Sequence, residues 1–251
     1  MPKLSCTIIT LNEADHIGRC IDTAWQVADE VVVIDSGSTD KTVSIAISKR
    51  AKVIHNDWTG YGPQKRVAED KAENDWVLNL DADEVLSKGL IEEIKTWKAS
   101  HASEPYGYRF KFVTVYPHHD KPRFRADYHD YIRLYNKDKM RFRNSLTHDA
   151  VVPGDHKIGR FENDCLHYSF KSLDHLKMKL DRYTDLQAKE ITKPLWLMRL
   201  RRPFEYPILF FRYYIGRGHM FGGLYGLKVV HIAAKHRGAR IRKFIEANRK
   251  S

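Results

Sequence analysis

The first hundred residues alternate short apolar runs with segments whose apolar residues recur at helical spacing. The runs at 4–10, 30–35, 52–55 and 76–80 predict parallel strands, because strands covered on both faces are continuously apolar. Helices are expected between them, where apolar residues repeat every three or four positions. The first carries Ile17 and Ile21, the second follows a cap at Asp40, and the third begins at Pro63 and runs to about Asn74. This β-α-β-α-β-α-β order predicts a Rossmann-like, mostly parallel sheet with helices on both faces.

After residue 105 the pattern changes. Two aromatic-rich stretches, at 106–116 and 128–136, predict antiparallel strands that complete the sheet, and 172–190 is expected to be helical. Beyond Pro194, bulky apolar residues alternate with arginines, and Pro203 and Pro207 predict breaks in any helix there. We expect a catalytic domain over 1–194, divided into halves at 1–100 and 101–170, and a largely helical appendage over 195–251.

The net charge of +11 is unevenly distributed. Residues 195–251 contain 13 Lys and Arg but 2 Asp and Glu, whereas residues 1–194 contain 30 of each sign. This basic segment indicates a polyanionic partner, which could be nucleic acid, an anionic membrane surface or a phosphorylated acceptor. Its aromatic residues could enter the headgroup region of a membrane while its arginines meet phosphates. The alternative is a basic helical subdomain packed on the core.

The cysteines and the amino terminus give an expectation about location. Cys6, Cys20 and Cys165 are odd in number and lack CxxC pairing, which argues against a disulfide framework and favours a reducing cytoplasm. The amino terminus lacks the layout of a signal peptide, and no apolar run approaches the roughly 20 residues needed to span a bilayer. We therefore expect a cytoplasmic protein.

The ends of the expected parallel strands are polar and acidic. They read Thr10-Leu11-Asn12-Glu13, Asp35-Ser36-Gly37 and Asp81-Ala82-Asp83-Glu84. Ligands collect beyond the carboxyl ends of such strands, and paired carboxylates suit Mg²⁺ or Mn²⁺, whose remaining ligands a pyrophosphate can supply. A bare DxD also occurs by chance as a solvated or helix-capping pair. Its position directly after a buried strand favours metal binding.

Two further segments suit nucleotide binding. A carboxylate at Asp35 can accept the imino hydrogen of uracil, and Gly37 permits close backbone approach, although Asp35 and Ser36 could merely end a strand. Residues 58–66 place a glycine-rich turn before Lys65 and Arg66 at a helix start, which suits phosphate or base contact. This segment is not a Walker loop, because GxxxxGK[ST] is absent.

Together, the motifs TIITLNEADHIGRCI, EVVVIDSGSTDKT, GYGPQKRVA and NLDADE resemble the glycosyltransferase family 2 enzymes with the GT-A fold. More closely, they resemble the bacterial lipopolysaccharide core β-1,4-glucosyltransferases that act on inner-core heptose. The resemblance covers about the first 90 positions and is looser afterwards. It implies an inverting hexosyltransferase that moves glucose from UDP-glucose to a lipopolysaccharide core heptose or a similar glycolipid.

The resemblance also assigns roles to residues. Nucleotide-sugar contacts would come from the strand ends and the third helix, with Asp81 near ribose or sugar and Asp83 as the direct metal ligand. In full, the nucleotide-sugar set is Thr10, Asn12, Glu13, Asp35, Ser36, Gly37, Lys65, Arg66, Asp81 and Ala82. The acceptor motif of the family, usually His-Glu, corresponds here to His148-Asp149, so Asp149 would be the general base.

Three later features also resemble the family. His167, in an LHYS-like element, could complete the metal shell, although a lone histidine is more often structural. Tyr128 stands where the acceptor segment of the family has tryptophan. Residues 218–226 match a GF-x-DG-x-x-G element, except that glycine replaces its acid, which puts the role of that acid in doubt here.

We weigh three functions. A glycosyltransferase, peripheral on the inner face of the cytoplasmic membrane, explains the acidic strand ends and the basic segment together. A nucleic-acid-binding protein would leave Asp35, Asp81 and Asp83 unexplained, because carboxylates repel a phosphate backbone, so we expect no nucleic-acid partner. A sugar nucleotidyltransferase would be expected to carry a Gly-rich, arginine-containing loop where this chain has Leu11-Asn12-Glu13-Ala14. Another family 2 transferase for cell-surface glycan is the alternative to the heptose assignment.

Overall fold

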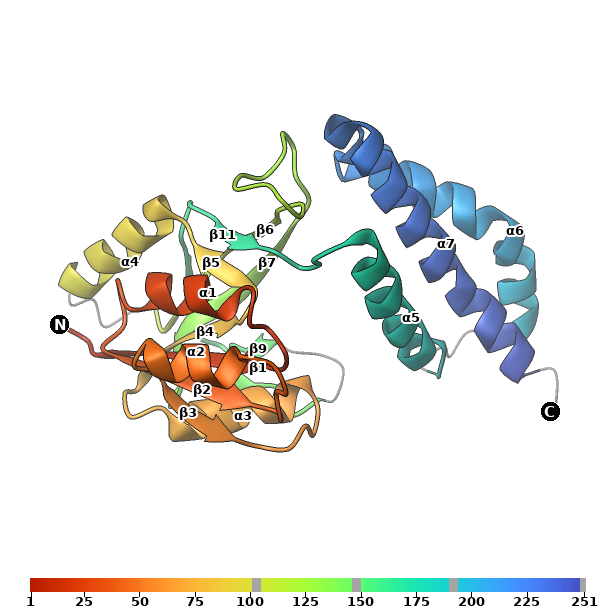
Figure 1. Cartoon of the computed structure of the whole chain (residues 1–251). Helices are drawn as coiled ribbons and strands as arrows, with labels where there is room; N and C mark the ends of the chain where they lie inside the picture. The colour runs from red at the N-terminus through yellow and green to blue at the C-terminus, as the bar shows by residue number, and fades with distance from the viewer. Residues whose placement is uncertain (101–104, 146–149, 190–193, 249–251) are drawn as a thin grey trace. The chain divides into compact units, whose positions relative to one another are not determined.

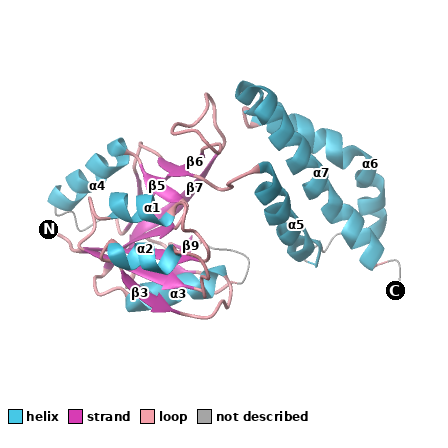
Figure 2. Cartoon of the chain, in the orientation of Figure 1, coloured by secondary structure: helices cyan, strands magenta, loops and turns pink. Residues whose placement is uncertain are grey.

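The computed structural model divides the chain into two compact units (Figure 1). Residues 1–113 and 128–168 form the first, called the sheet unit below, and residues 114–127 and 169–251 form the second, the helical unit. The structure describes residues 1–100, 105–145, 150–189 and 194–248, with the backbone alone at 182, 183 and 185–189. Within these residues, strands occur in the sheet unit, whereas helices and loops make up the helical unit (Figure 2).

Nine strands of the described chain form one mixed sheet in the order β3-β2-β1-β4-β7-β6-β11-β5, with β10 beside β6. Strands β1 to β4 are mutually parallel where they pair, and β7 runs antiparallel to both β4 and β6. The four expected parallel strands and the two expected antiparallel strands are therefore confirmed. The strands are β1 (Leu4–Thr10), β2 (Glu30–Asp35), β3 (Lys52–His55), β4 (Trp76–Asp81), β5 (Glu84–Leu86), β6 (Gly107–Thr114), β7 (Tyr128–Asn136), β10 (Ile158–Arg160) and β11 (Cys165–His167), with β8 (Arg141–Phe142) and β9 (Val151–Val152) forming a separate antiparallel pair.

Helices cover both faces of the parallel strands, as alternation of side chains along a strand requires. Leu4, Cys6 and Ile8 of β1 face a core shared with α1 (Ile17–Ala24), α2 (Thr42–Ser48) and α4 (Lys88–Ser100). Ile9 faces the other side, where α3 (Tyr61–Lys71) contributes Ala68. All three cysteines are buried and unpaired. The sheet unit thus has the α/β architecture expected from the sequence.

The helical unit contains α5 (Leu173–Lys189), α6 (Leu195–Phe211), a π-helical turn at Arg212–Gly216, a 3₁₀ turn at His219–Gly222 and α7 (Gly223–Ala247). Leu209 of α6 and Val230 of α7 share one apolar cluster, while Phe170 and Val229 share another. Because α5 packs on α7, the chain from Ser169 onward belongs to this unit, together with residues 114–127. Among the described helices, none is both long and apolar enough to cross a membrane.

The predicted breaks at Pro203 and Pro207 are wrong, because α6 runs through both prolines. A proline inside a helix removes the hydrogen bond to the carbonyl four residues earlier. Here both prolines are exposed, and so is Arg199, whose carbonyl loses its partner to Pro203. Water can satisfy carbonyls on such a face, and the helix is held by its opposite, buried side, which carries Met198 and Leu209.

Candidate functional site

The parallel strands bring three of the expected site residues to one edge of the sheet. In the register of the sheet, Thr10 lies opposite Asp35, and Ile9 lies opposite Asp81. All three strands end within a residue of these positions, so the polar groups that follow them are neighbours in space. The hydroxyl oxygen of Thr10 is buried and has no hydrogen-bond partner among the described residues.

Asp35 organises the turn that follows β2. Its Oδ2 accepts the backbone N–H groups of Gly37 and Ser38, both at 2.9 Å, and its Oδ1 accepts the Ser38 hydroxyl at 2.5 Å. Gly37 has a φ of 95°, which favours glycine. A carboxylate has about four acceptor positions, so Asp35 retains acceptor capacity beyond the turn. It can both stabilise the turn and accept a further donor.

The first strand end is tied to the same turn. Asn12, at a φ of 56°, accepts the backbone N–H of Thr39 at 2.8 Å and donates its own N–H to Ser38 Oγ at 2.8 Å. The backbone N–H of Glu13 donates to Thr42 Oγ1 at 2.8 Å. The two loops therefore form one connected rim beside the sheet edge.

Asp81 lies between two cationic side chains. Lys65 Nζ, on a fully buried side chain of α3, is 2.9 Å from Asp81 Oδ1, and Arg133 Nη2 of β7 is 3.6 Å from Oδ2. The ring of Phe142 lies below both cations, 5.1 Å from Lys65 Nζ and 5.7 Å from the Arg133 guanidinium. Arg133 also donates to Asn79 Oδ1 at 2.5 Å. Two positive charges around one carboxylate make the immediate surroundings of Asp81 positive, which suits a diphosphate.

Glu84 supports the turn that carries the DxD motif. It is buried, and its Oε2 accepts the backbone N–H of Asp81 at 2.7 Å. Burial, followed by the nearby charge of Asp81, raises the pKa of Glu84 to about 7. This carboxyl group therefore holds the turn in place from inside the protein.

Asp83 lies in the turn before β5, and His167 lies beside it at the end of β11. His167 Nε2 is 3.4 Å from Asp83 Oδ2, because His167 pairs with Glu84 in the antiparallel ladder. Among the described residues, no group of three or more His, Cys, Asp or Glu could hold a metal ion. A carboxylate oxygen and an imidazole nitrogen nevertheless fit Mn²⁺ or Mg²⁺, provided that a bound diphosphate supplies further oxygens.

The other expected residues fall in different places. Ser36 Oγ accepts Gln64 Nε2 at 2.9 Å, and Ala82 is buried in the DxD turn. Arg66 Nη1 donates to the Phe142 carbonyl at 3.0 Å, away from its neighbour Lys65. Asp149, the expected base, and His148 lie outside the described residues. Asp130 lies outside this edge, with Arg109 at 2.9 Å from its Oδ1 and Arg160 at 2.6 Å from its Oδ2, so arginines engage both of its oxygens.

Sequence reasoning missed Arg133 and did not give Glu84 a role. Arg133 lies in an aromatic-rich strand, whose pattern predicts a core. No local pattern predicts that Arg133 reaches Asp81, because the two strands become neighbours only in the folded sheet. Glu84 had a usable signal: an acid directly after a DxD motif that begins a short strand. Both side chains contact Asp81: Arg133 lies beside its carboxylate, and Glu84 accepts its backbone N–H.

In α/β proteins with a parallel sheet, ligands bind beyond the carboxyl ends of the strands, which is where this edge of acidic and cationic side chains lies. A model of the family named Glycosyl transferase family 2 matches residues 5–164. The chain is 40% identical to an "uncharacterized glycosyltransferase" of Rickettsia felis, an alignment that covers 100% of this chain and 92% of that protein. It is 30% identical to the lipopolysaccharide core biosynthesis glycosyltransferase LpsC of Rhizobium meliloti, covering 90% and 86%. The chain therefore belongs to glycosyl transferase family 2, and it is a glycosyltransferase with the GT-A fold.

Solved structures add more distant likenesses. The crystal structure of S. aureus TarS 1–349 is 15% identical with a TM-score of 0.49, covering 99% of this chain and 91% of TarS. Glucosyl-3-phosphoglycerate synthase from Mycobacterium tuberculosis, in complex with Mn²⁺ and UDP-glucose, is 23% identical with a TM-score of 0.36, covering 46% of this chain and 44% of the synthase.

Proposed function

We propose that the chain is an inverting transferase that moves glucose from UDP-glucose to a heptose of the lipopolysaccharide inner core or to a similar glycolipid. The observation that carries the proposal is Asp81, held between Lys65 and Arg133 two residues before Asp83. The two cations suit the diphosphate, while the DxD turn offers carboxylate oxygens on the same edge. The relative LpsC, named for lipopolysaccharide core biosynthesis, supports the acceptor class.

In this proposal, each side chain has a separate task. Thr10, Asn12, Glu13 and the Asp35 turn bind the nucleoside, Lys65 and Arg133 lie at the diphosphate, and Asp83 with His167 would hold a divalent metal. Bound there, Mg²⁺ or Mn²⁺ would neutralise charge on the departing UDP. Asp83 and His167 are fixed by the β5–β11 ladder, so the metal site would be preformed on the protein side.

The transfer itself needs a base on the acceptor side. The acceptor hydroxyl oxygen attacks the anomeric carbon, the bond from that carbon to the phosphate oxygen breaks, and UDP leaves with the bonding electrons. The hydroxyl proton passes to a carboxylate, which we assign to Asp149. Attack opposite the leaving group inverts the configuration at the anomeric carbon.

We also propose that the helical unit binds an anionic membrane surface, which would place the enzyme at the inner face of the cytoplasmic membrane. Six large apolar residues of α6 and the following turn are exposed at spacings of three and four, so they form one stripe: Trp196, Leu200, Phe204, Ile208, Phe211 and Ile215. Exposed Arg199 and Arg212 flank it. An apolar stripe flanked by arginines is typical of interfacial helices.

The test of the transfer is UDP release from UDP-glucose, with Mn²⁺ or with a chelator, in the presence and absence of de-acylated lipopolysaccharide core. We expect acceptor-dependent release that the chelator abolishes and that Asp83→Ala reduces by roughly 10³-fold. Asp22→Ala, which removes an exposed carboxylate paired with Lys49, is the matched control and should leave the rate unchanged. Full turnover in Asp83→Ala would remove the metal assignment, and salt-sensitive RNA binding without turnover of any nucleotide-sugar would overturn the proposal.

The test of the membrane proposal is flotation with vesicles of phosphatidylglycerol or of phosphatidylcholine alone. We expect binding to the anionic vesicles, and its loss in the combined variant Trp196→Ser, Phe204→Ser, Phe211→Ser. Equal binding by that variant would contradict the assignment of the stripe. If the variant instead changed the oligomeric state, a second copy of the chain would be the partner that covers the stripe.

A further inference from the structure

A hollow of about 360 Å³ lies beside the β8–β9 pair in the sheet unit. This volume is within the range of pockets that bind small molecules. Its lining is strongly basic, and Asp138 is the sole acidic residue among the described lining residues. The cationic or titratable side chains are Arg66, Lys137, Lys139, Arg141, Arg143 and His156.

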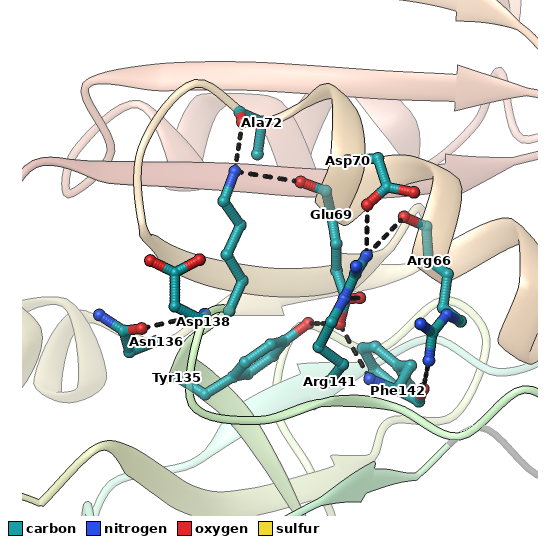
Figure 3. Close-up of polar contacts among 10 residues, drawn as sticks. Arg66, Glu69, Asp70, Ala72, Tyr135, Asn136, Asp138, Arg141 and Phe142 are labelled. Carbon is teal, nitrogen blue, oxygen red and sulfur yellow. Dashed lines mark hydrogen bonds and ion pairs between the residues drawn. The ribbon is translucent and has the colours of Figure 1, made fainter.

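Two of these cations are already committed to the protein (Figure 3). Arg141 is 2.7 Å from Glu69 and 2.5 Å from Asp70, and Lys137 donates to the Ala72 carbonyl at 2.6 Å. Glu69 is fully buried, and it also accepts the Tyr135 hydroxyl at 2.8 Å. These contacts tie β8 and the end of β7 to α3. They build the floor of the hollow and leave little charge for a ligand.

The other cations have no such neutralisation. Within the described ranges, Arg66, Lys139 and Arg143 form no ion pair with a carboxylate; Arg66 donates only to the Phe142 carbonyl, and Lys139 lies 5.6 Å from the Tyr106 ring centre. Like charges gathered around a hollow whose lining holds a single carboxylate among the described residues, that of Asp138, repel one another and attract an anion. Arginine and lysine together suit a phosphate, which accepts several hydrogen bonds and carries up to two charges.

Chain connectivity links this hollow to the segment that carries the proposed base. The backbone N–H of Arg143 donates to the carbonyl of Ala150 at 2.9 Å, and Ala150 is the next residue after Asp149. The same segment packs tightly on the start of α3, since Gly62 N–H donates to Ser145 O at 3.0 Å and a Cβ at Gly62 would lie 2.2 Å from Arg143 O. A group bound beside Arg143 is therefore close in the chain to the proposed base.

We infer that this hollow binds a phosphate group carried by the acceptor sugar. The inference rests on the proposed function, because that function supplies an acceptor. The basic lining of the hollow is an observation that does not depend on the proposed function. A phosphate held by Arg66, Lys139 and Arg143 would orient the acceptor from a point separate from the donor edge at Asp81. The enzyme would then prefer a phosphorylated acceptor over the same sugar without phosphate.

The first experiment measures binding of inorganic phosphate to the full chain by ³¹P NMR, with and without saturating UDP and Mn²⁺. We expect binding in both conditions, and a dissociation constant roughly tenfold higher in the double variant Lys139→Gln, Arg143→Gln. Lys71→Gln removes an exposed cation of α3 that does not line the hollow, so it should bind as the wild type. Displacement of phosphate by UDP, or equal binding by the double variant, would overturn the inference.

The second experiment compares phosphorylated and dephosphorylated core acceptors in steady-state transfer. The double variant should raise KM for the phosphorylated acceptor about tenfold and leave KM for UDP-glucose within a factor of two. If the proposed transferase activity is absent, phosphate binding still tests the hollow by itself. If transfer occurs but both acceptors have the same KM in wild type, the acceptor phosphate assignment is wrong.

Discussion

The two units of the chain use apolar and polar residues in opposite ways. The sheet unit buries continuous apolar strands between helices and places a mostly buried charged pair, Lys65 with Asp81, at one edge of its sheet. The helical unit keeps small apolar clusters inside and exposes large apolar side chains such as Trp196 and Phe211. In the first unit, the burial of charge marks the site. In the second, the exposure of apolar surface marks the proposed membrane-binding face.

The helical unit also contains a buried charged cluster around His219. His219 accepts or donates a 2.6 Å hydrogen bond with the Tyr116 hydroxyl and lies 3.6 Å from Asp127, which Arg123 also contacts at 2.7 Å. Gly222 and Gly226 allow close approach, because a Cβ at either would collide with Tyr116 or with the His219 carbonyl. The segment that lacks the acid of the family therefore has Asp127 beside it from another part of the chain.

The largest effect should fall on activity in the sheet unit. Asp149→Asn should lower kcat by about 10³-fold, because the amide cannot take the acceptor proton, while UDP affinity stays unchanged. Single-turnover kinetics and UDP titration measure the two quantities. An unchanged kcat would mean that another residue is the base. Asp130 is one carboxylate to test next, although two arginines hold it.

A second effect of similar size should appear in stability. Lys65→Met leaves the Asp81 carboxylate without its nearest cation in a mostly buried site, which should cost about 4 kcal/mol in unfolding free energy. Lys49→Met breaks an ion pair with exposed Asp22 and should cost less than about 1 kcal/mol. Urea denaturation measures both. Equal losses would mean that burial does not distinguish the two pairs.

Within the helical unit, buried and exposed apolar residues should differ clearly. Leu209→Ala opens a cavity in the cluster with Tyr213 and Val230 and should cost about 3 kcal/mol. Phe211→Ala, on the exposed stripe two residues later, should change stability by about 0.5 kcal/mol or less. Thermal and urea unfolding measure both variants. A large loss in Phe211→Ala would mean that the stripe packs on protein.

The smallest effect is a pH dependence of the helical unit. Burial, followed by the positive charge of Arg123, lowers the pKa of His219 from 6.5 to about 4. Between these values the unfolded chain binds a proton that the folded chain does not, so stability falls as pH falls through that window. From pH 7.5 to 5 the loss should be about 2 kcal/mol. His219→Gln should remove this part of the slope, and an unchanged slope would assign it to other groups.

The sequence predicted the parallel half of the sheet closely, because continuous apolar runs and helical spacing are local signals. Strands β1, β2 and β3 begin and end at the expected residues, and α5 begins one residue after its expected start. The predicted breaks at the prolines of α6 were wrong, because a local rule about proline takes no account of the tertiary packing of Met198 and Leu209. Local patterns could not show that α5 packs on α7, because α7 follows it by some fifty residues of chain.

The residues of the candidate site also divide into those with a local sequence signal and those without one. Asp35, Asp81 and Asp83 could be expected, because each directly follows a strand and strand ends of a parallel sheet share an edge. Arg133 could not, since it reaches Asp81 from an antiparallel strand fifty residues away whose pattern predicts a core. The basic hollow depends on residues from α3, the turn after β7 and the segment after β9, and no single motif contains them.

The central claim is that the acidic edge of the sheet binds a nucleotide through a divalent metal. Calorimetric titration of UDP into the full chain, with Mn²⁺ or with a chelator, tests it most directly. We predict that Mn²⁺ strengthens UDP binding at least about tenfold in the wild type, and that Asp83→Ala removes this dependence while retaining the weaker, metal-free binding. Equal UDP affinity with Mn²⁺ and with chelator in the wild type would contradict the account.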